Sequence, residues 1–220
     1  KRMDAKLQQG LEAAGFVSFG FATSGFANIM SRVPVTTLGD LKGKRVWVPD
    51  GDDISYVSMK SLSLNPVTLP LTDVLTGLQT GLVDIVAIPP IVALVLQWHT
   101  KVKYVTRVPL VYTIGFMAID KKSFEKISAE DQTIVREVMS KTYENFDRIN
   151  LVDNENAFKA LVKSGIKQVE LDKDEYVKTR NLLLASNLEL GQKGEFTLVL
   201  YQEMLRYIEQ YRTEQVTAGE

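Results

Sequence analysis

The chain has 220 residues, of which 45% are hydrophobic and 24% charged, and its formal net charge is −1 at pH 7. This near-neutral charge gives no electrostatic reason to expect nucleic acid as a partner, and no apolar run approaches the length of a membrane-spanning helix. Because the sequence contains no cysteine, disulfides, thiol catalysis and thiolate metal sites are excluded. The length suits one large or two small domains.

The N-terminal residues predict a helix followed by a strand. Apolar residues recur at helical spacing over residues 3–14, and Gly15 is placed to stop the helix. Residues 16–22 alternate loosely, as a strand does, with Gly20 as a flexible point. The first residues read as the middle of a helix rather than as a natural start or a signal peptide, so a preceding segment is expected to be missing.

The stretch from Leu38 to Pro90 predicts alternating strands and helices. A continuous apolar run over residues 83–88 is expected of a strand that is buried on both faces. The other elements expected here are a strand over 46–48 ending at Pro49, a helix opened by Gly51, Asp52 and Asp53, a strand closed by residues 69–71, and a helix capped by Thr72 or Asp73 and ended after Gln79 by Gly81. This order predicts a parallel α/β arrangement.

The second half of the chain predicts further strands and longer helices. The expected elements are a helix over 91–98, strands over 102–106 and 112–119, a helix from the Ser128–Asp131 capping motif to Lys163, a strand over 166–171, a helix capped by Asp172 and broken by Gly191 and Gly194, and a final helix over 196–211. The helix that ends at Lys163 is roughly 50 Å long at the standard rise, which is enough to span more than one lobe of a compact protein.

Three short motifs follow one another within residues 38–84. They are DLKG at residues 40–43, VP at 48–49 and LQTGLVD at 78–84. In this combination the chain resembles the extracytoplasmic solute-binding proteins of tripartite ATP-independent periplasmic (TRAP) transporters. The specific motif is confined to this stretch, whereas the order of elements resembles the family over nearly the whole chain.

The resemblance implies a two-lobed, venus-flytrap α/β protein with parallel or mixed sheets and a long lobe-spanning helix. Residues 1–24 and 113–152 are expected to form the remnant of lobe one, and residues 25–112 and 153–220 to form lobe two and the C-terminal helices. The N-terminal part of lobe one is expected to be absent. The implied function is that of a periplasmic receptor, which captures a small organic solute, closes by hinge motion and delivers the solute to a TRAP membrane permease.

At three positions the chain has an apolar residue where the family pattern has a polar one. The family binds carboxylates chiefly with an arginine on the strand before Val-Pro, because a guanidinium matches a carboxylate bidentately; the resemblance places Trp47 there. A second family arginine corresponds to Ala27, and an asparagine corresponds to Ile88. An unpaired carboxylate buried against such side chains would cost several kcal/mol. The implied ligand is therefore larger, less charged or partly aromatic rather than a simple dicarboxylate, with Trp47 either a stacking wall or a core residue.

Five further residues are candidates for ligand contact, each with a structural alternative. Arg45 alternates onto the same face as Trp47 and is the candidate for a replacement cation. Tyr112 corresponds to an aromatic position on a family strand or packs in the core. Thr72 and Asp73 lie at a helix start and either bind ligand or only cap the helix. His99 follows an apolar helix, where a histidine also suits the helix C-terminus.

The sequence predicts neither an enzyme nor a metal or cofactor site. It contains no nucleophile elbow and no glycine-rich phosphate loop, and its single histidine excludes a histidine-based metal cluster. The acidic residues at positions 50, 52 and 53 lack the alternating pattern of a calcium loop and suit a helix N-terminus better. Two alternatives to the receptor remain open, namely a ligand-sensing or interaction domain and an enzyme built on the same frame.

Overall fold

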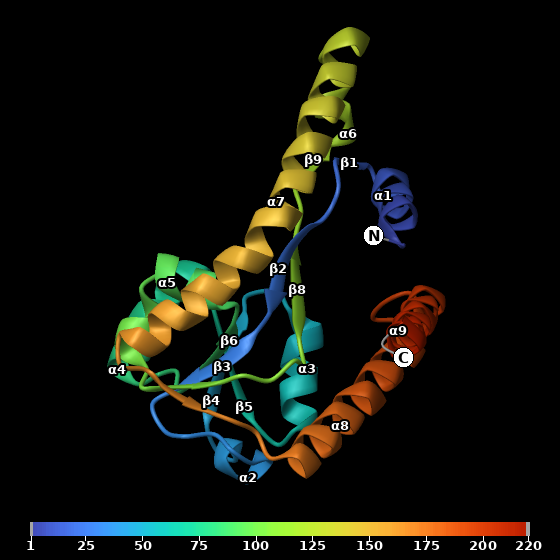
Figure 1. Ribbon diagram of the computed structural model, residues 1–220. Coiled ribbons are helices and arrows are strands. Elements are labelled where there is room, and N and C mark those ends of the chain that lie inside the picture. Colours follow the sequence, from blue (N-terminus) through green and yellow to red (C-terminus); the bar gives the residue numbers. More distant parts are fainter. Residues whose placement is uncertain (1, 219–220) are drawn as a thin grey trace. The chain divides into compact units, whose positions relative to one another are not determined.

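The computed structural model describes the backbone of residues 2–218 and the side chains of residues 2–214 (Figure 1). Within this part the chain packs as two compact units. Unit 1 comprises residues 1–22, 115–146 and 188–220, and unit 2 comprises residues 23–114 and 147–187. Among the described residues, no helix is both long and apolar enough to cross a membrane.

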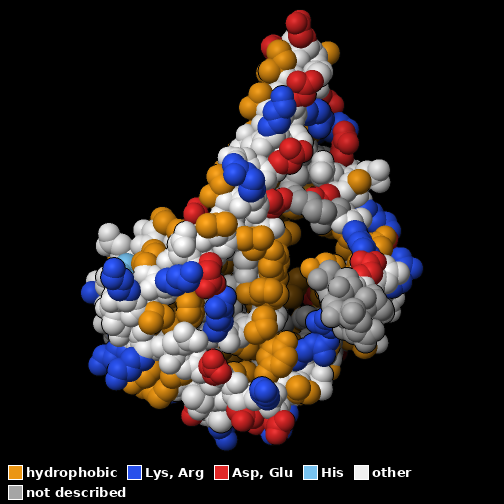
Figure 2. Space-filling model, in the orientation of Figure 1, with side chains coloured by type: hydrophobic (Ala, Val, Ile, Leu, Met, Phe, Trp, Pro, Cys, Tyr) orange, Lys and Arg blue, Asp and Glu red, His pale blue; other side chains and the backbone are white. Residues whose placement is uncertain are grey.

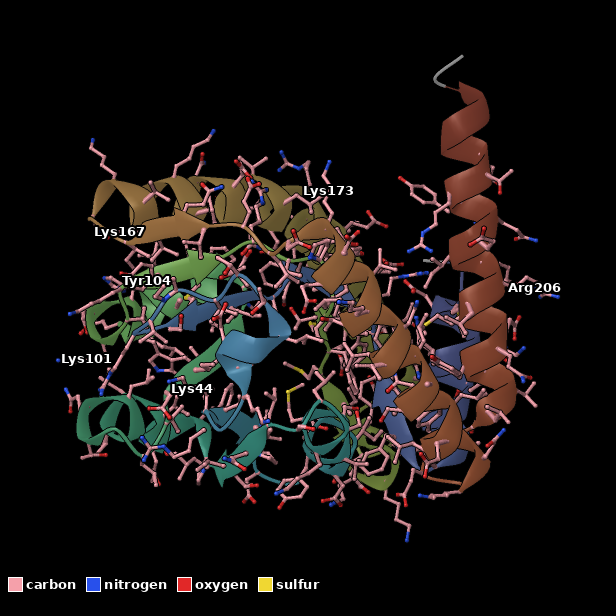
Figure 3. All side chains as sticks on the ribbon, turned by 90° about the horizontal axis from the view of Figure 1, so that it is seen from below. Lys44, Lys101, Tyr104, Lys167, Lys173 and Arg206 are labelled. Carbon is pink, nitrogen blue, oxygen red and sulfur yellow. The ribbon has the colours of Figure 1, made fainter. Side chains whose placement is uncertain are left out.

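Unit 2 is built on a mixed sheet whose strand order is β10-β7-β3-β6-β4-β5 among the described residues. These strands are β3 (Asn28–Ser31), β4 (Arg45–Pro49), β5 (Asn65–Leu69), β6 (Ile85–Ile88), β7 (Tyr104–Thr106) and β10 (Lys167–Val169). β4 is parallel to β5 and β6, whereas β3 is antiparallel to β6 and β7. β10 joins β7 in parallel at one edge, where Figure 3 shows Tyr104 and Lys167 on adjacent strands.

Helices cover both faces of this sheet. The elements concerned are α2 (Leu38–Leu41), α3 (Asp53–Ser61), the 3₁₀ turn η1 (Leu71–Asp73), α4 (Val74–Thr80), α5 (Pro90–Val95), the 3₁₀ turn η2 (Trp98–Lys101), and parts of α7 (Ala129–Lys163) and α8 (Lys173–Gln192). One face packs on α4, α5, η2 and α7 around Met30, Leu78 and Trp98. The opposite face packs on α2 and α3 around Val46 and Ile85.

Unit 1 contains its own smaller core. Its elements are α1 (Asp4–Ala13), β1 (Phe16–Ser18), β9 (Ala118–Asp120), α6 (Lys121–Phe124), the remaining parts of α7 and α8, and α9 (Leu198–Ala218). β1 pairs antiparallel with β9, and Val17, Phe19, Phe124 and Tyr143 pack together. The Tyr143 hydroxyl accepts a hydrogen bond from the Met117 N–H at 2.7 Å. Ion pairs join Arg2 to Glu214 and Lys6 to Glu203, and thereby link α1 to α9.

Three polar side chains of α7 form hydrogen bonds with the backbone of the strand β2. β2 (Ala22–Phe26) pairs with β8 (Tyr112–Gly115) as a two-stranded ribbon within the described residues. Asp147 accepts from the Thr23 N–H at 2.8 Å, and Asn150 donates to the Thr23 carbonyl at 2.6 Å. One turn further along, Asn154 donates to the Ser24 carbonyl at 2.6 Å. These bonds satisfy backbone groups of β2.

Most of the predicted elements are confirmed. α7 is one continuous helix of 35 residues, and α4 ends at Gly81, which takes the left-handed conformation at φ 77°. The predicted capping residues bind the first turns that follow them, since Asp52 accepts from Ser55 N–H at 2.9 Å and Asp172 accepts from Asp174 N–H at 2.9 Å. At the start of α7, Ser128 accepts from the Asp131 N–H at 3.1 Å.

Several predicted boundaries are wrong. The strand expected over residues 16–22 is divided into β1 and β2, because Gly20 lies between them at φ 137°. The strand expected over 112–119 is likewise divided into β8 and β9. The helix expected over 91–98 ends at Val95, since Gln97 adopts φ 60° and interrupts the helical backbone.

Gly191 was expected to break a helix but lies inside α8. A Cβ atom at this position would lie 2.9 Å from a Leu198 methyl carbon and 3.0 Å from the Phe196 ring. Glycine at this position therefore lets the Leu198 and Phe196 side chains pack closely against α8. The helix ends at Gln192, and Gly194 forms the following turn at φ 85°.

Candidate functional site

The predicted ligand residues are distributed over both faces of the unit 2 sheet. Because side chains alternate along a strand, Trp47 of β4 and Ile88 of β6 share the face that packs on α4 and α7. Ala27 belongs to the opposite face, next to Ile29. The structure thus brings Trp47 and Ile88 to one face and places Ala27 on the other.

Trp47 is half-buried and engaged in structural contacts. Its indole N–H donates to the Leu69 carbonyl on β5 at 3.0 Å. Its ring meets Trp98 edge-on, with the ring centroids 5.1 Å apart. Such a pair stabilises a fold by about 0.5–1.5 kcal/mol beyond its buried area. These contacts fix the orientation of the Trp47 ring and satisfy its polar atom.

Arg45 is paired with an acidic residue of the LQTGLVD motif. Its Nε and Nη2 atoms each donate to the Asp84 carboxylate at 2.9 Å, and the Arg45 backbone N–H donates to the same carboxylate at 3.1 Å. The hydrogen bonds from Arg45 lower the pKa of Asp84, and the carboxylate in turn raises the pKa of Arg45. A ligand carboxylate would therefore have to compete with Asp84 for this guanidinium.

Ala27 and Tyr112 lie beside one another near the β2–β8 ribbon. Ala27 is buried, and its N–H donates to the carbonyl of Val111 at 2.9 Å. Tyr112 is 47% exposed, and its ring meets Phe26 edge-on at 4.8 Å between centroids. Ile114 on the same ribbon is also exposed, and Figure 2 shows hydrophobic side chains gathered on the visible surface over β2 and β8.

The remaining candidates contact their own local backbone or one another. Thr72 and Asp73 lie in the exposed turn η1, where the Thr72 hydroxyl donates to the Asp73 carboxylate at 3.2 Å. Asp73 occupies the N-cap position of α4, yet its side chain accepts no capping bond, so the predicted side-chain cap is wrong. His99 lies in η2, and its Nδ1 is 3.1 Å from the Ala93 carbonyl oxygen.

The described residues contain an apolar cavity that the sequence did not reveal. It lies in unit 2, against the face of the sheet that carries Ala27, and has a volume of about 60 Å³. Residues from the sheet, α2, α3, α8 and the 108–111 segment line it: Ala27, Ile29, Leu38, Leu41, Val46, Met59, Leu62, Leu64, Ile85, Ala87, Val108, Leu110, Val111, Leu171, Thr179 and Leu183. Because these residues are spread over more than 150 positions of the sequence, no local pattern could have predicted the cavity.

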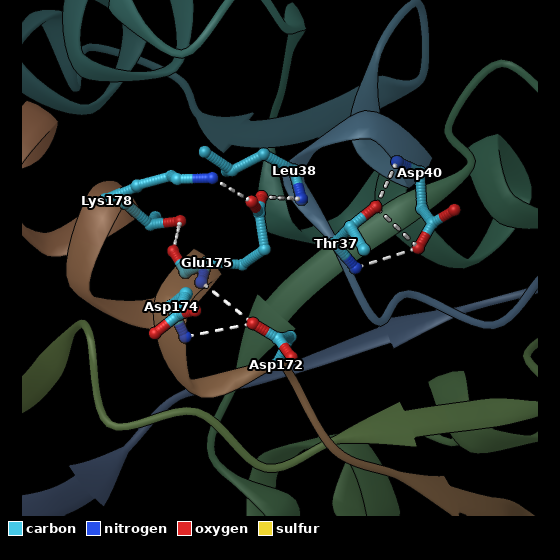
Figure 4. Close-up of polar contacts among 8 residues, drawn as sticks. Thr37, Leu38, Asp40, Asp172, Asp174, Glu175 and Lys178 are labelled. Atoms are coloured by element: carbon cyan, nitrogen blue, oxygen red, sulfur yellow. Dashed lines mark hydrogen bonds and ion pairs between the residues drawn. The ribbon is translucent and has the colours of Figure 1, made fainter.

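Polar contacts position α8 against α2 at the edge of this cavity (Figure 4). The Glu175 carboxylate accepts from the Leu38 N–H at 3.1 Å and from the Lys178 ammonium at 2.7 Å. These two hydrogen bonds, with that from Lys178 the larger influence, lower the pKa of Glu175. The Asp172 N–H donates to the Thr36 carbonyl at 2.9 Å. The N-terminal turn of α8 is therefore fixed to the segment that begins α2.

Asp40 of the DLKG motif has a structural role at the same place. Its carboxylate accepts from the N–H groups of Thr36 and Thr37 at 2.8 Å each, and these bonds lower the pKa of Asp40. Thr37 completes a capping box by accepting from the Asp40 N–H at 3.3 Å. Within the described part of the chain, no three potential metal-binding side chains come together.

The mixed α/β fold is that of the TRAP periplasmic solute-binding proteins. The chain superimposes on such a protein from Haemophilus influenzae with bound L-gulonate at a TM-score of 0.83 and 21% identity, covering 92% of this chain and 66% of that one. It superimposes on the sugar acid binding protein of Advenella mimigardefordensis in complex with galactonate at a TM-score of 0.80 and 25% identity, covering 86% and 61%.

The chain belongs to the bacterial extracellular solute-binding protein family 7, whose model matches residues 1–187. It is 27% identical over 137 residues to the 2,3-diketo-L-gulonate-binding periplasmic protein YiaO of Escherichia coli, covering 60% of this chain and 42% of that protein. It is 22% identical over 184 residues to the C4-dicarboxylate-binding periplasmic protein DctP of Rhodobacter capsulatus, covering 83% and 55%. The chain thus spans about half the length of these relatives, and the predicted family and α/β class are confirmed.

Proposed function

We propose that this chain is part of a periplasmic receptor that binds a small organic solute and delivers it to a TRAP membrane permease. The observation that carries the proposal is the family match over residues 1–187. It is supported by relatives whose names describe periplasmic binding proteins and by similar structures that hold L-gulonate or galactonate. These proteins are described as binding proteins and not as enzymes.

We further propose that the solute is not a simple dicarboxylate. At positions where the TRAP resemblance implies polar side chains, the chain has Ala27, Trp47 and Ile88. Ala27 and Ile88 are buried, and Trp47 donates its indole proton to the backbone. Arg45, the candidate replacement cation, is paired with Asp84. A compact dianion would meet no free guanidinium among these residues, and burying its charge without a partner costs several kcal/mol.

The experiment is to recover the solute itself. The full-length protein is purified from its host without added ligands, denatured, and the released small molecules are identified by mass spectrometry against a mock purification. We expect one compound in near-stoichiometric amount, with at most one carboxylate. A recovered dicarboxylate would overturn the proposal about the ligand while supporting the receptor function.

A second measurement tests the receptor function independently of what is recovered. The ligand-free protein is screened by thermal unfolding against a library of sugar acids, neutral polyols and aromatic acids, because a ligand that binds only the native state raises the melting temperature. We expect at least one compound to raise it saturably. If no compound does so and no molecule is recovered, the receptor proposal is wrong. If a compound is consumed rather than returned unchanged, an enzyme on this frame is the better description.

A further inference from the structure

We propose that one edge of the unit 2 sheet is a docking surface for an anionic lipid bilayer. Strands β4, β5, β6, β7 and β10 all run in one direction and β3 runs in the other, so their amino ends lie at the same edge as the carboxyl end of β3. We call this the amino edge, and it comprises residues 31–33, 42–45, 60–65, 82–84, 101–104 and 163–167. The proposal goes beyond the receptor function, and its test requires no solute.

Positive charge is concentrated at the amino edge. Its six segments contain nine basic residues and one acidic residue, although the whole chain has a formal net charge of −1. The acidic residue, Asp84, is neutralised by its ion pair with Arg45 at 2.9 Å. Figure 3 shows three of the basic residues, Lys44, Lys101 and Lys167, on the same side of unit 2.

Helix ends account for only part of this charge. Lys60 and Lys163 lie in the last turns of α3 and α7, where the helix dipole favours a cation. Lys103 and Lys167 instead lie where β7 and β10 begin, and both are exposed. Neither takes part in an ion pair with another described residue. The strand starts therefore present cations whose charge no neighbouring group balances.

The opposite edge of the same sheet has the reverse charge. The acidic residues that follow β4, β5 and β10 there are Asp50, Asp52, Asp53, Asp73, Glu170 and Asp172. Arg107, which follows β7, is paired with Glu155 at 2.7 Å. The charges of unit 2 thus form a dipole across the sheet, and an anionic surface attracts the amino edge while it repels the opposite edge.

Two features favour a bilayer over a nucleic acid or an acidic protein. The amino edge extends over six strands, which is about 24 Å at the usual strand spacing, so its cations face a broad surface together. Exposed apolar side chains lie among them, since Val33 is 40% and Leu82 47% exposed. A lipid interface receives both cations and apolar side chains, whereas a phosphate backbone attracts only the cations.

Co-sedimentation with vesicles tests the proposal on the purified protein. Vesicles of phosphatidylcholine with about one third phosphatidylglycerol are compared with vesicles of phosphatidylcholine alone. At about 0.1 M salt we expect saturable binding to the anionic vesicles, and at least about tenfold weaker binding to the neutral ones. About 1 M salt should release the protein, because the Debye length falls from about 10 Å to about 3 Å. Absent binding to anionic vesicles, or equal binding to both kinds, would overturn the proposal.

A charge-reversal variant locates the binding. Lys103→Glu combined with Lys167→Glu reverses two exposed charges of the amino edge and should weaken binding to anionic vesicles at least about tenfold. The matched control combines Lys122→Glu with Lys126→Glu, at exposed positions of unit 1, and changes the net charge equally. It should bind as the parent does. Equal weakening in both variants would refute the assignment to this edge. Lys→Gln at the same positions repeats the comparison if a Glu variant does not fold.

A further pair of variants tests whether the partner is a bilayer. Leu82→Ser removes an apolar side chain from the amino edge and should weaken vesicle binding about threefold. Leu71→Ser is the control, because Leu71 is 52% exposed in η1, beyond the carboxyl end of β5, and it should bind as the parent does. Unchanged binding by folded Leu82→Ser would refute a bilayer as the partner.

Competition with other polyanions separates the remaining partners. Polyglutamate or duplex DNA is added to the vesicle-bound protein at an equal concentration of anionic groups, and we expect the protein to stay on the vesicles. Its release by either polymer would overturn the proposal in favour of an acidic protein or a nucleic acid. Because none of these measurements contains a solute, failure of the receptor proposal would leave their outcomes unchanged.

Discussion

The contacts of Trp47 lead to a graded prediction for three substitutions. Trp47→Phe removes the hydrogen bond to the Leu69 carbonyl but keeps a ring against Trp98, so only the bond, about 0.5–1.5 kcal/mol, is lost. Trp47→Ala also removes the aromatic pair and leaves a cavity. Complete truncation of a buried tryptophan costs about 3–5 kcal/mol, and because Trp47 is half-buried we expect about 3 kcal/mol. Trp47→Arg should cost at least as much, since the guanidinium would replace a ring within the core.

Urea unfolding followed by fluorescence is suited to this measurement. The chain has two tryptophans, Trp47 and Trp98, and both lie in unit 2. Trp98 therefore reports on the unfolding of this unit in every Trp47 variant. Tyr211→Ala, which removes an aromatic ring that is 57% exposed on α9 of unit 1, is the control and should change stability by less than about 0.5 kcal/mol.

The outcome separates a structural from a ligand-binding role for Trp47. If Trp47→Ala unfolds within about 0.5 kcal/mol of the parent, the contacts to Leu69 and Trp98 contribute little and the structural reasoning is wrong. Solute binding is then measured on the same variants. A Trp47→Arg protein that stays folded and gains affinity for a dicarboxylate would support the proposed correspondence with the family arginine. Unaltered binding and stability would contradict both roles.

Three further predictions concern polar and glycine positions. Asn154→Ala should destabilise unit 2 by about 1–3 kcal/mol, because partly buried backbone groups of β2 and α5 lose their partner; urea unfolding with an unchanged midpoint would contradict this. Since Arg45 lowers the pKa of Asp84, this carboxylate stabilises the fold above its unfolded pKa near 3.8 and the stabilisation is lost as the pH falls further. In Asp84→Asn the free energy of unfolding should therefore fall less steeply as the pH drops below about 4. The same pH dependence in the variant and the parent would refute a stabilising role of the Asp84 carboxylate. Gly81→Ala should destabilise by about 1–2 kcal/mol because φ is 77°, whereas Gly10→Ala inside α1, with open space around it, should stabilise by about 0.5–1 kcal/mol; thermal unfolding that shows the same sign for both would contradict the reasoning.

Local sequence chemistry predicted the elements whose ends depend on neighbouring residues. Asp52 and Asp172 bind the N–H groups that follow them, and Gly81 ends its helix by a backbone conformation that other residues adopt at a cost. The errors arose where a residue pattern does not reveal the backbone conformation. Gln97 and Gly20 adopt positive φ values and interrupt predicted elements, whereas Gly191 stays within α8 with Phe196 and Leu198 packed against it.

The candidate site was less predictable than the fold because its parts are far apart in sequence. The cavity needs Ala27 from the start of the sheet, Ala87 from its centre and Leu183 from α8. None of these residues is unusual in its own segment, and only the folded chain brings them around one space. Candidate ligand residues could be named from the family resemblance and stay a prediction, but the pattern did not show that Trp47 and Ala27 belong to opposite faces of the sheet.

The motif residues on which the family resemblance rests have structural roles in the backbone of this chain. Asp40 of the DLKG motif binds the N–H groups before α2, Gly81 ends α4, and Asp84 holds Arg45 across the neighbouring strand. The first two features fix where a helix begins or ends, the third joins β4 to the residue before β6, and none of them involves a solute. We therefore expect a substitution at Trp47 to leave these backbone features in place, because none of them involves the Trp47 side chain. For this reason the family match supports a receptor, whereas the identity of the solute must be measured.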